Sequence, residues 1–146
     1  MLIRVVAATI AGGVVFMLVG FLIFGLALAE TMKAWTVNYP GLMKEPPNFI
    51  ALFLSNLAWA FLLAVIYERW AGIRTFRAGA IAGAVILFIT VAAMDFQYKA
   101  FMVLMIGFAP MIVDMLAAAV LGALAGGVVG MVLGMMNKGS TAAGLE

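Results

Sequence analysis

The side chains of this sequence that could do chemistry are a few polar residues within or beside long apolar runs. Asp114 follows Pro110 by four residues and precedes 22 residues without a polar side chain, and Asp95 closes an earlier apolar run. An ionised carboxylate is costly in lipid, so such acids are candidates for binding protons or cations. The simpler interpretations place Asp114 at the membrane boundary, near the positive end of its helix, and pair Asp95 with Lys99 four residues on.

Three further polar side chains complete the candidate site: Glu30, Asn56 and Gln97. Asn56 should lie about 10 Å inside its helix at a rise of 1.5 Å per residue. It therefore needs a hydrogen-bond partner within the bundle, and we expect either a structural bond or a bond to Asp114. If successive helices alternate in direction, these residues share one half of the membrane with Asp95 and Asp114. We expect the five to line one polar pocket that opens outward.

Histidine and cysteine are both absent. Their absence removes the commonest general base, the thiol nucleophile and the commonest metal ligands, so we predict no enzyme, no metal centre and no cofactor. Methionine is abundant, with 12 residues, and Met111–Met115 and Met131–Met135 have the spacing of paired thioether ligands for Cu(I). Methionine is also an ordinary filler of apolar helices, and we prefer that interpretation.

Four apolar segments must position these side chains. The chain is 68% hydrophobic and 10% charged, whereas soluble proteins are about 45–50% apolar and about 25% charged, so the bilayer is the solvent that fits. A spanning helix needs about 20 apolar residues. We predict an all-α polytopic membrane protein, a four-helix transmembrane bundle forming a single domain over residues 1–136. The expected helices are 5–29, 49–67, 78–98 and 110–136, followed by a flexible cytoplasmic tail at 137–146.

The segments between these helices are less well defined. The first helix ends in Ala27-Leu28-Ala29, which resembles a signal-peptide cleavage site, but its 25 uncharged residues exceed the roughly 7–15 of a signal peptide, so we expect a retained helix. A loop is expected from Glu30 to Pro47. Residues 100–109 are too few to span the membrane, and three alternatives stay open for them: a helix extension, an interfacial segment or a re-entrant segment.

Basic residues indicate the orientation of the helices. Those expected on one side are Arg4, Arg69, Arg74, Arg77 and Lys138, and those on the other are Lys33, Lys44 and Lys99. Cytoplasmic loops carry the excess of Lys and Arg, so we predict a multi-pass protein of the bacterial cytoplasmic (inner) membrane with both termini in the cytoplasm. No basic run suggests a nucleic-acid partner.

Small residues at four-residue intervals indicate where helices pack closely. They are Gly122, Gly126, Gly130 and Gly134 in the last helix, and Gly79 and Gly83 in the third. Helices in lipid associate where small side chains let their backbones approach. We expect this ladder to face protein within the bundle, with a homodimer seam as the alternative, so leucine at Gly126 or Gly130 should lower thermal stability.

Short motifs occur in a fixed order along nearly the whole chain. They are Gly20-x4-Gly25, Gly41-Leu42-Met43-Lys44-Glu45-Pro46-Pro47, Tyr67-Glu68-Arg69-Trp70-Ala71, and Val113-Asp114 opening the glycine-rich last helix. This order resembles a large family of uncharacterised small bacterial integral membrane proteins, a domain of unknown function with four predicted helices. The resemblance implies the fold and supplies no activity.

The sequence thus favours a structural or accessory membrane protein of unknown activity. Its partners would be the lipid bilayer and, as an alternative, a second copy or another membrane protein. The competing hypothesis is a small proton- or cation-coupled transporter or channel that uses the acids of the outer half, Asp114 above all.

Overall fold

The computed structural model describes the backbone of residues 1–142 and the side chains of residues 1–137. Its helices are α1 (Leu2–Gly20), the π-helix η1 (Phe21–Ala27), α2 (Ala29–Trp35), α3 (Phe49–Val65), the π-helix η2 (Ile66–Ala71), α4 (Phe76–Phe101) and α5 (Ala109–Ala142). Four helical stretches are long and apolar enough to cross a membrane: Leu2–Ala27, Phe49–Ala71, Phe76–Phe101 and Ala109–Asn137. The predicted all-α, multi-pass bundle is confirmed.

Local capping signals set where two of these helices begin. The side chain of Asn48 accepts a hydrogen bond of 3.1 Å from the amide of Ala51 at the start of α3. Thr75 does the same for Ala78 at 3.3 Å, so α4 begins at Phe76, two residues before the predicted start. These side chains satisfy amide groups that have no partner within the first turn of a helix.

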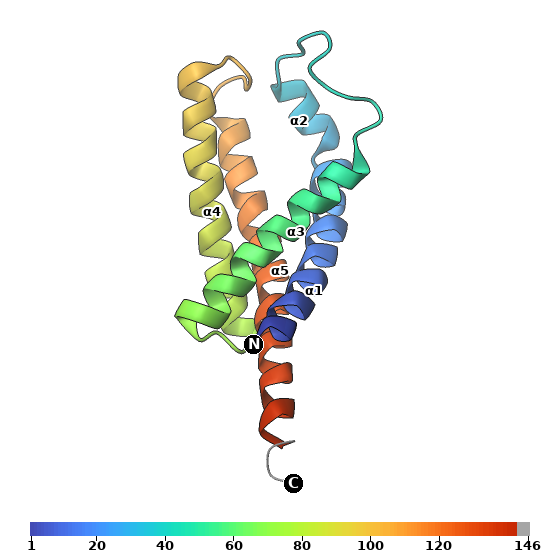
Figure 1. Ribbon diagram of the computed structural model, residues 1–146. Helices are drawn as coiled ribbons and strands as arrows, with labels where there is room; N and C mark the ends of the chain where they lie inside the picture. Colours follow the sequence, from blue (N-terminus) through green and yellow to red (C-terminus); the bar gives the residue numbers. More distant parts are fainter. Residues whose placement is uncertain (143–146) are drawn as a thin grey trace.

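The helices form two antiparallel pairs (Figure 1). α4 packs on α5, α3 packs on α1, and the pairs are joined mainly through contact of α1 with α5. Leu2 and Ala142 lie at the same end, here called the terminal end. The opposite end, called the cap end, carries α2 and the loops of residues 36–48 and 102–108, and the two pairs diverge toward it.

The α4–α5 seam is a contact between backbones. A Cβ atom built on Gly126 would lie 2.6 Å from the carbonyl oxygen of Gly79, and one built on Gly83 would collide with the carbonyl oxygen of Gly122. Such close approach of backbones is possible only where side chains are absent. The ladder continues beyond α4, because a Cβ at Gly130 would lie 2.7 Å from the carbonyl oxygen of Thr75 in the preceding loop. The small-residue ladder therefore packs within the chain.

At the cap end, α4 continues to Phe101 and residues 102–108 form a loop. An isolated antiparallel bridge joins Thr36 to Met105, flanked by backbone hydrogen bonds of 2.8 and 2.9 Å between residues 35–37 and 104–106. Of the three alternatives for residues 100–109, the helix extension holds for the first two residues only. Residues 102–108 join α4 to α5 and, through the bridge between Met105 and Thr36, also connect the two helix pairs across the cap end.

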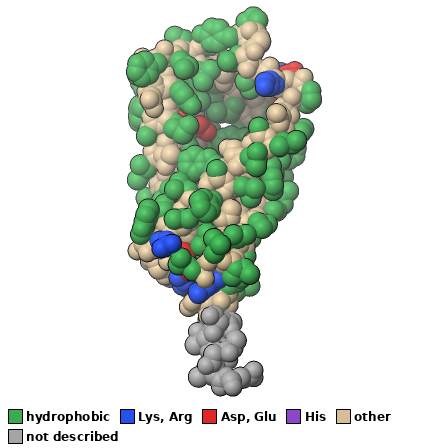
Figure 2. Space-filling model, in the orientation of Figure 1, with side chains coloured by type: hydrophobic (Ala, Val, Ile, Leu, Met, Phe, Trp, Pro, Cys, Tyr) green, Lys and Arg blue, Asp and Glu red, His purple; other side chains and the backbone are tan. Residues whose placement is uncertain are grey.

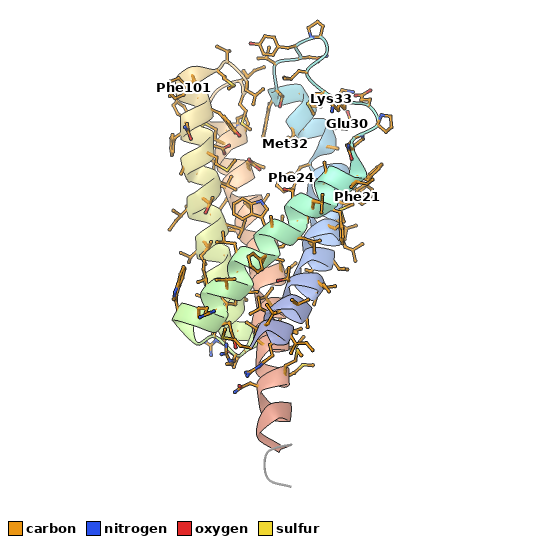
Figure 3. The ribbon with its side chains drawn as sticks, in the orientation of Figure 1. Phe21, Phe24, Glu30, Met32, Lys33 and Phe101 are labelled. Atoms are coloured by element: carbon orange, nitrogen blue, oxygen red, sulfur yellow. The ribbon has the colours of Figure 1, made fainter. Side chains whose placement is uncertain are left out.

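The segment after the first span and the C-terminal tail also differ from expectation. The segment expected to be loop from Glu30 to Pro47 begins with α2, which lies at the cap end with Glu30 and Lys33 on the side away from α4 and α5 (Figure 3). The tail expected from residue 137 is helical up to Ala142, because α5 continues without a break. The rest of that tail, residues 143–146, lies outside the described residues.

Candidate functional site

Asp95 is the acid that is buried near the cap end of the bundle. It lies on the stripe of α4 that also contains Gly79, Gly83 and Leu87, so it faces the α4–α5 seam near the cap end. Its side chain is 5% exposed, and its Oδ2 atom has no hydrogen-bond partner among the residues whose side chains are described. A buried polar atom without a partner costs free energy, which makes Asp95 the strongest candidate for binding a ligand or a proton.

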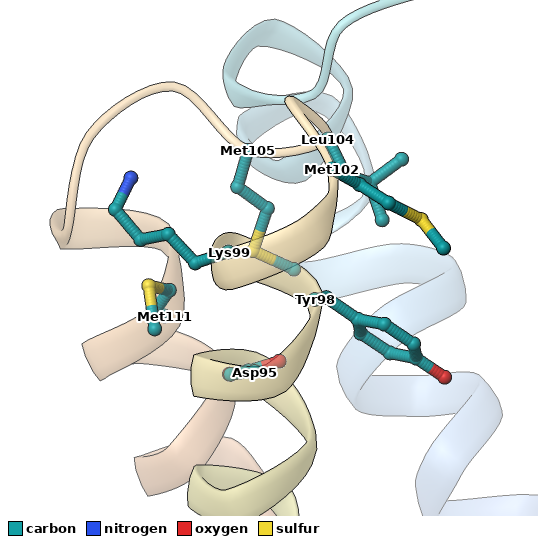
Figure 4. Close-up of a pocket in the computed structure, with 7 residues that line it drawn as sticks. All are labelled: Asp95, Tyr98, Lys99, Met102, Leu104, Met105 and Met111. Carbon is teal, nitrogen blue, oxygen red and sulfur yellow. The ribbon is translucent and has the colours of Figure 1, made fainter.

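A cavity of about 10 Å³ lies beside Asp95 (Figure 4). Its lining includes Tyr98, Lys99 and three methionines, Met102, Met105 and Met111. This volume holds roughly one water molecule or one ion.

The expected ion pair between Asp95 and Lys99 is not formed. The Lys99 ammonium donates to the carbonyl oxygen of Gly107 at 3.3 Å and lies 4.7 Å from the centroid of the Phe108 ring. Both partners belong to the connection between α4 and α5, which offers the ammonium a carbonyl and an aromatic face. None of the basic side chains in the described part of the chain pairs with the Asp95 carboxylate, which lies beside the cavity.

Asp114 lies on α5, half-buried, and near enough to Asp95 for their charges to interact. It forms no hydrogen bond or ion pair within the described part of the chain. Figure 2 shows a hollow in the cap half of the molecule with an acidic side chain on its rim. The structure therefore brings together two of the five predicted residues.

The other three predicted residues lie apart from this pair. The amide nitrogen of Asn56 donates to the sulfur of Met17 at 3.3 Å, so its partner is on α1 and the expected bond to Asp114 is wrong. The reason is that α3 packs on α1 at this level, where a Cβ at Gly13 would meet Leu57. Glu30 and Gln97 are exposed. The five-residue polar pocket is thus not assembled.

A second polar cluster lies at the terminal end, and the sequence did not predict that its residues come together. Glu68, on η2, has a side chain only 5% exposed and pairs with Arg74 at 2.7 Å and with Arg4 at 3.8 Å. Arg4 also donates to the side-chain oxygen of Asn137 on α5 at 2.5 Å. We call Arg4, Glu68, Arg74 and Asn137 the ionic cluster. The sequence signal for this cluster is that Glu68 lies close to arginines at a helix end. The arginines by themselves predict only the orientation of the helices.

Tyr67 connects the ionic cluster to the glycine seam. Its ring is fully buried, and its hydroxyl donates to the carbonyl oxygen of Gly79 at 2.7 Å. The backbone carbonyl of Tyr67 accepts a hydrogen bond of 3.4 Å from Arg74. The second span, the third span and the loop between them are thereby fixed to one another at this end.

Fold and site together define a class: a multi-pass α-helical membrane protein that is closely packed at one end and holds the buried Asp95 within electrostatic range of the half-buried Asp114 near the other. The chain matches no family model, no curated protein and no solved structure. The resemblance to a family of small four-helix membrane proteins stays a prediction.

Proposed function

We propose that this chain is a non-enzymatic accessory protein of a bacterial cytoplasmic membrane. The glycine seam is the observation that carries the proposal. Where Gly79, Gly83, Gly122 and Gly126 put backbone against backbone, the helices cannot slide or separate without losing contact along the seam. Such packing favours one stable conformation over the alternating conformations of a transporter.

The cap end faces outward in this proposal, and both termini lie in the cytoplasm. All four arginines of the chain, Arg4, Arg69, Arg74 and Arg77, belong to the terminal end. The lysines at the cap end include Lys33 and Lys99. An excess of basic residues marks the cytoplasmic side.

The bilayer is the first partner of such a protein. Large apolar side chains are exposed along every span, among them Ile10, Phe61, Ile89 and Val120. In water these side chains would form an aggregating surface, whereas lipid tails solvate them. A second copy or another membrane protein is the partner that the accessory role implies in addition.

Absence of the usual catalytic groups supports a non-enzymatic role. The sequence has no histidine or cysteine, and the cavity beside Asp95 is lined by thioethers, a phenol and Lys99, whose ammonium is bound to the Gly107 carbonyl oxygen. A hydrolytic or group-transfer site needs a nucleophile within reach of a base.

Proton or cation coupling is the second candidate function. It is favoured by the buried Asp95 oxygen without a partner and by Asp114 close by. Two carboxyls in one apolar environment resist being ionised together, so such a pair binds a proton or a cation.

Flux measurements in liposomes separate the two functions. We expect the reconstituted protein to carry no proton, sodium or potassium flux above that of empty liposomes, because the seam holds one conformation. Asp95→Asn and Asp114→Asn, checked for an unchanged fold by circular dichroism, should give the same baseline. A flux in the wild-type protein that either variant abolishes would overturn the accessory role and establish coupling through the acidic pair.

A further inference from the structure

Two methionine side chains meet the buried carboxylate at the cap end. Met111 lies in the first turn of α5 and is 2% exposed, and Met105 lies in the loop between α4 and α5. Figure 4 shows the Met105 side chain directed toward Asp95, the Met111 side chain on the α5 side of the cavity, and the Met102 side chain pointing away from it. Two thioethers and one carboxylate from three successive segments therefore border one small cavity.

The backbone holds these groups in place. Met105 is the loop residue that bridges to Thr36, and the hydrogen bonds on either side of the bridge connect the loop to the end of α2. Met111 follows Pro110, which is also buried. Because the backbone at both methionines is held in place, ligand binding needs to order only their side-chain torsions and no backbone segment.

The donor set and its charge select the class of ligand. Thioethers are neutral, soft donors that favour Cu(I), while Na⁺, Mg²⁺ and Ca²⁺ favour several oxygen ligands. The lining supplies one carboxylate, that of Asp95. A single monovalent cation would neutralise this carboxylate, and a neutral site suits a low-dielectric environment.

The arrangement of the charged groups around the cavity is compatible with a bound cation. Lys99 belongs to the lining, but its ammonium is directed to the Gly107 carbonyl and the Phe108 ring. Asp114, from α5, is a second carboxyl within electrostatic range of Asp95.

We propose that the cavity between α4, α5 and their connecting loop binds one soft monovalent cation, Cu(I) or its analogue Ag(I), through the Asp95 carboxylate and the thioethers of Met105 and Met111. The proposal deepens the accessory function and rests on it, since it assigns the protein a ligand that is held and not transported. In the proposed orientation this site faces the outer side of the membrane.

Silver binding to the purified full chain in detergent tests the site. Titration of silver nitrate in chloride-free buffer should show one Ag(I) bound per chain, with a raised melting temperature. The double variant Met105→Leu/Met111→Leu and the single variant Asp95→Asn should each weaken binding by roughly tenfold or more, because loss of even a supporting group at a metal site costs about 10–100-fold in affinity.

The matched control is Met131→Leu/Met135→Leu. These two methionines have the four-residue spacing of ligand pairs but are exposed and lie in the terminal half of α5. We expect this control to bind Ag(I) as the wild type does. The site is overturned if the wild type binds no stoichiometric Ag(I), or if the control loses as much affinity as Met105→Leu/Met111→Leu.

Measuring Ag(I) flux with the same protein in liposomes distinguishes a failure of the proposed metal site from a failure of the proposed accessory function. Stoichiometric Ag(I) binding without Ag(I) flux supports both proposals. Binding with Ag(I) flux retains the site and overturns the accessory role. If neither binding nor flux is found, the site is wrong and the accessory role is unaffected.

Discussion

Leucine at Gly126 should prevent the bundle from folding stably in detergent. A Cβ atom there would lie 2.6 Å from the carbonyl oxygen of Gly79 and 2.7 Å from the hydroxyl of Tyr67. Overpacking of a core usually costs about 1–3 kcal/mol, and here the obstacles are a backbone and a buried phenol that cannot rotate away. We expect Gly126→Ala to lower the melting temperature clearly and Gly126→Leu to abolish the cooperative transition, followed by tryptophan fluorescence.

Gly20→Ala is the matched control for the seam. The Cβ atom of an alanine at this position would meet only the Cδ2 atom of Leu121, at 3.8 Å, which is an ordinary contact. Alanine is also favoured over glycine in a helix by about 1 kcal/mol, so this variant should be as stable as the wild type or slightly more stable. Equal melting curves for Gly126→Ala and Gly20→Ala would show that the α4–α5 contact is not as close as described.

Neutralising Glu68 should have the second-largest effect. Removing one partner of a buried ion pair costs about 3–5 kcal/mol. Because the side chains of Arg74 and Arg4 are 28% and 20% exposed, water can resolvate them, and we expect a smaller loss of about 2 kcal/mol for Glu68→Gln. The readout is the free energy of unfolding in a titration with a denaturing detergent.

The control for this variant is Glu45→Gln. Glu45 lies in the exposed loop before α3, where loss of a solvated charge should change stability by no more than about 0.5 kcal/mol. A Glu68→Gln protein that is as stable as the Glu45→Gln protein would mean that the ionic cluster does not stabilise the terminal end.

The spans could be predicted from the sequence because lipid imposes a minimum length on apolar helices. The first and last residues of the helices depend on local signals such as capping side chains, and the number of consecutive apolar residues does not contain these signals. Thr75 caps α4 and so moves its start to Phe76. Residues 29–35 fold as a short helix even though Glu30 and Lys33 made that segment look like loop.

The glycine ladder could be located from its spacing, and the burial of Asp95 could also have been predicted from the sequence. Counting back in fours from Asp95 reaches Leu87, Gly83 and Gly79, so one stripe of α4 carries both the seam and the acid. The four-residue spacing favoured an ion pair of Asp95 with Lys99, and the apolar run after Asp114 favoured Asp114 as the leading acid. In the structure Asp95 is the less solvent-exposed of the two.

The remaining differences arise from helix pairing. Hydropathy does not specify which helix packs on which, so the contact of Asn56 with Met17 on α1 could not be read from either segment alone. The π-helices add a second difficulty, because a π-turn contains an extra residue and shifts the face of every residue after it. Glu68 lies within η2, and its position in the ionic cluster depends on that shift.

The proposed orientation places the Asp95 cavity on the outer side of the membrane, and this placement requires the cap end to face away from the cytoplasm. The chain has no cysteine, so a single thiol can report the side on which it lies. Lys44→Cys places this thiol in the exposed loop before α3, and Arg77→Cys places it at the exposed start of α4. With a membrane-impermeant maleimide, Lys44→Cys should be labelled in intact spheroplasts and Arg77→Cys only after the membrane is permeabilised. Labelling of Arg77→Cys in intact spheroplasts, with Lys44→Cys protected until permeabilisation, would contradict the proposed orientation.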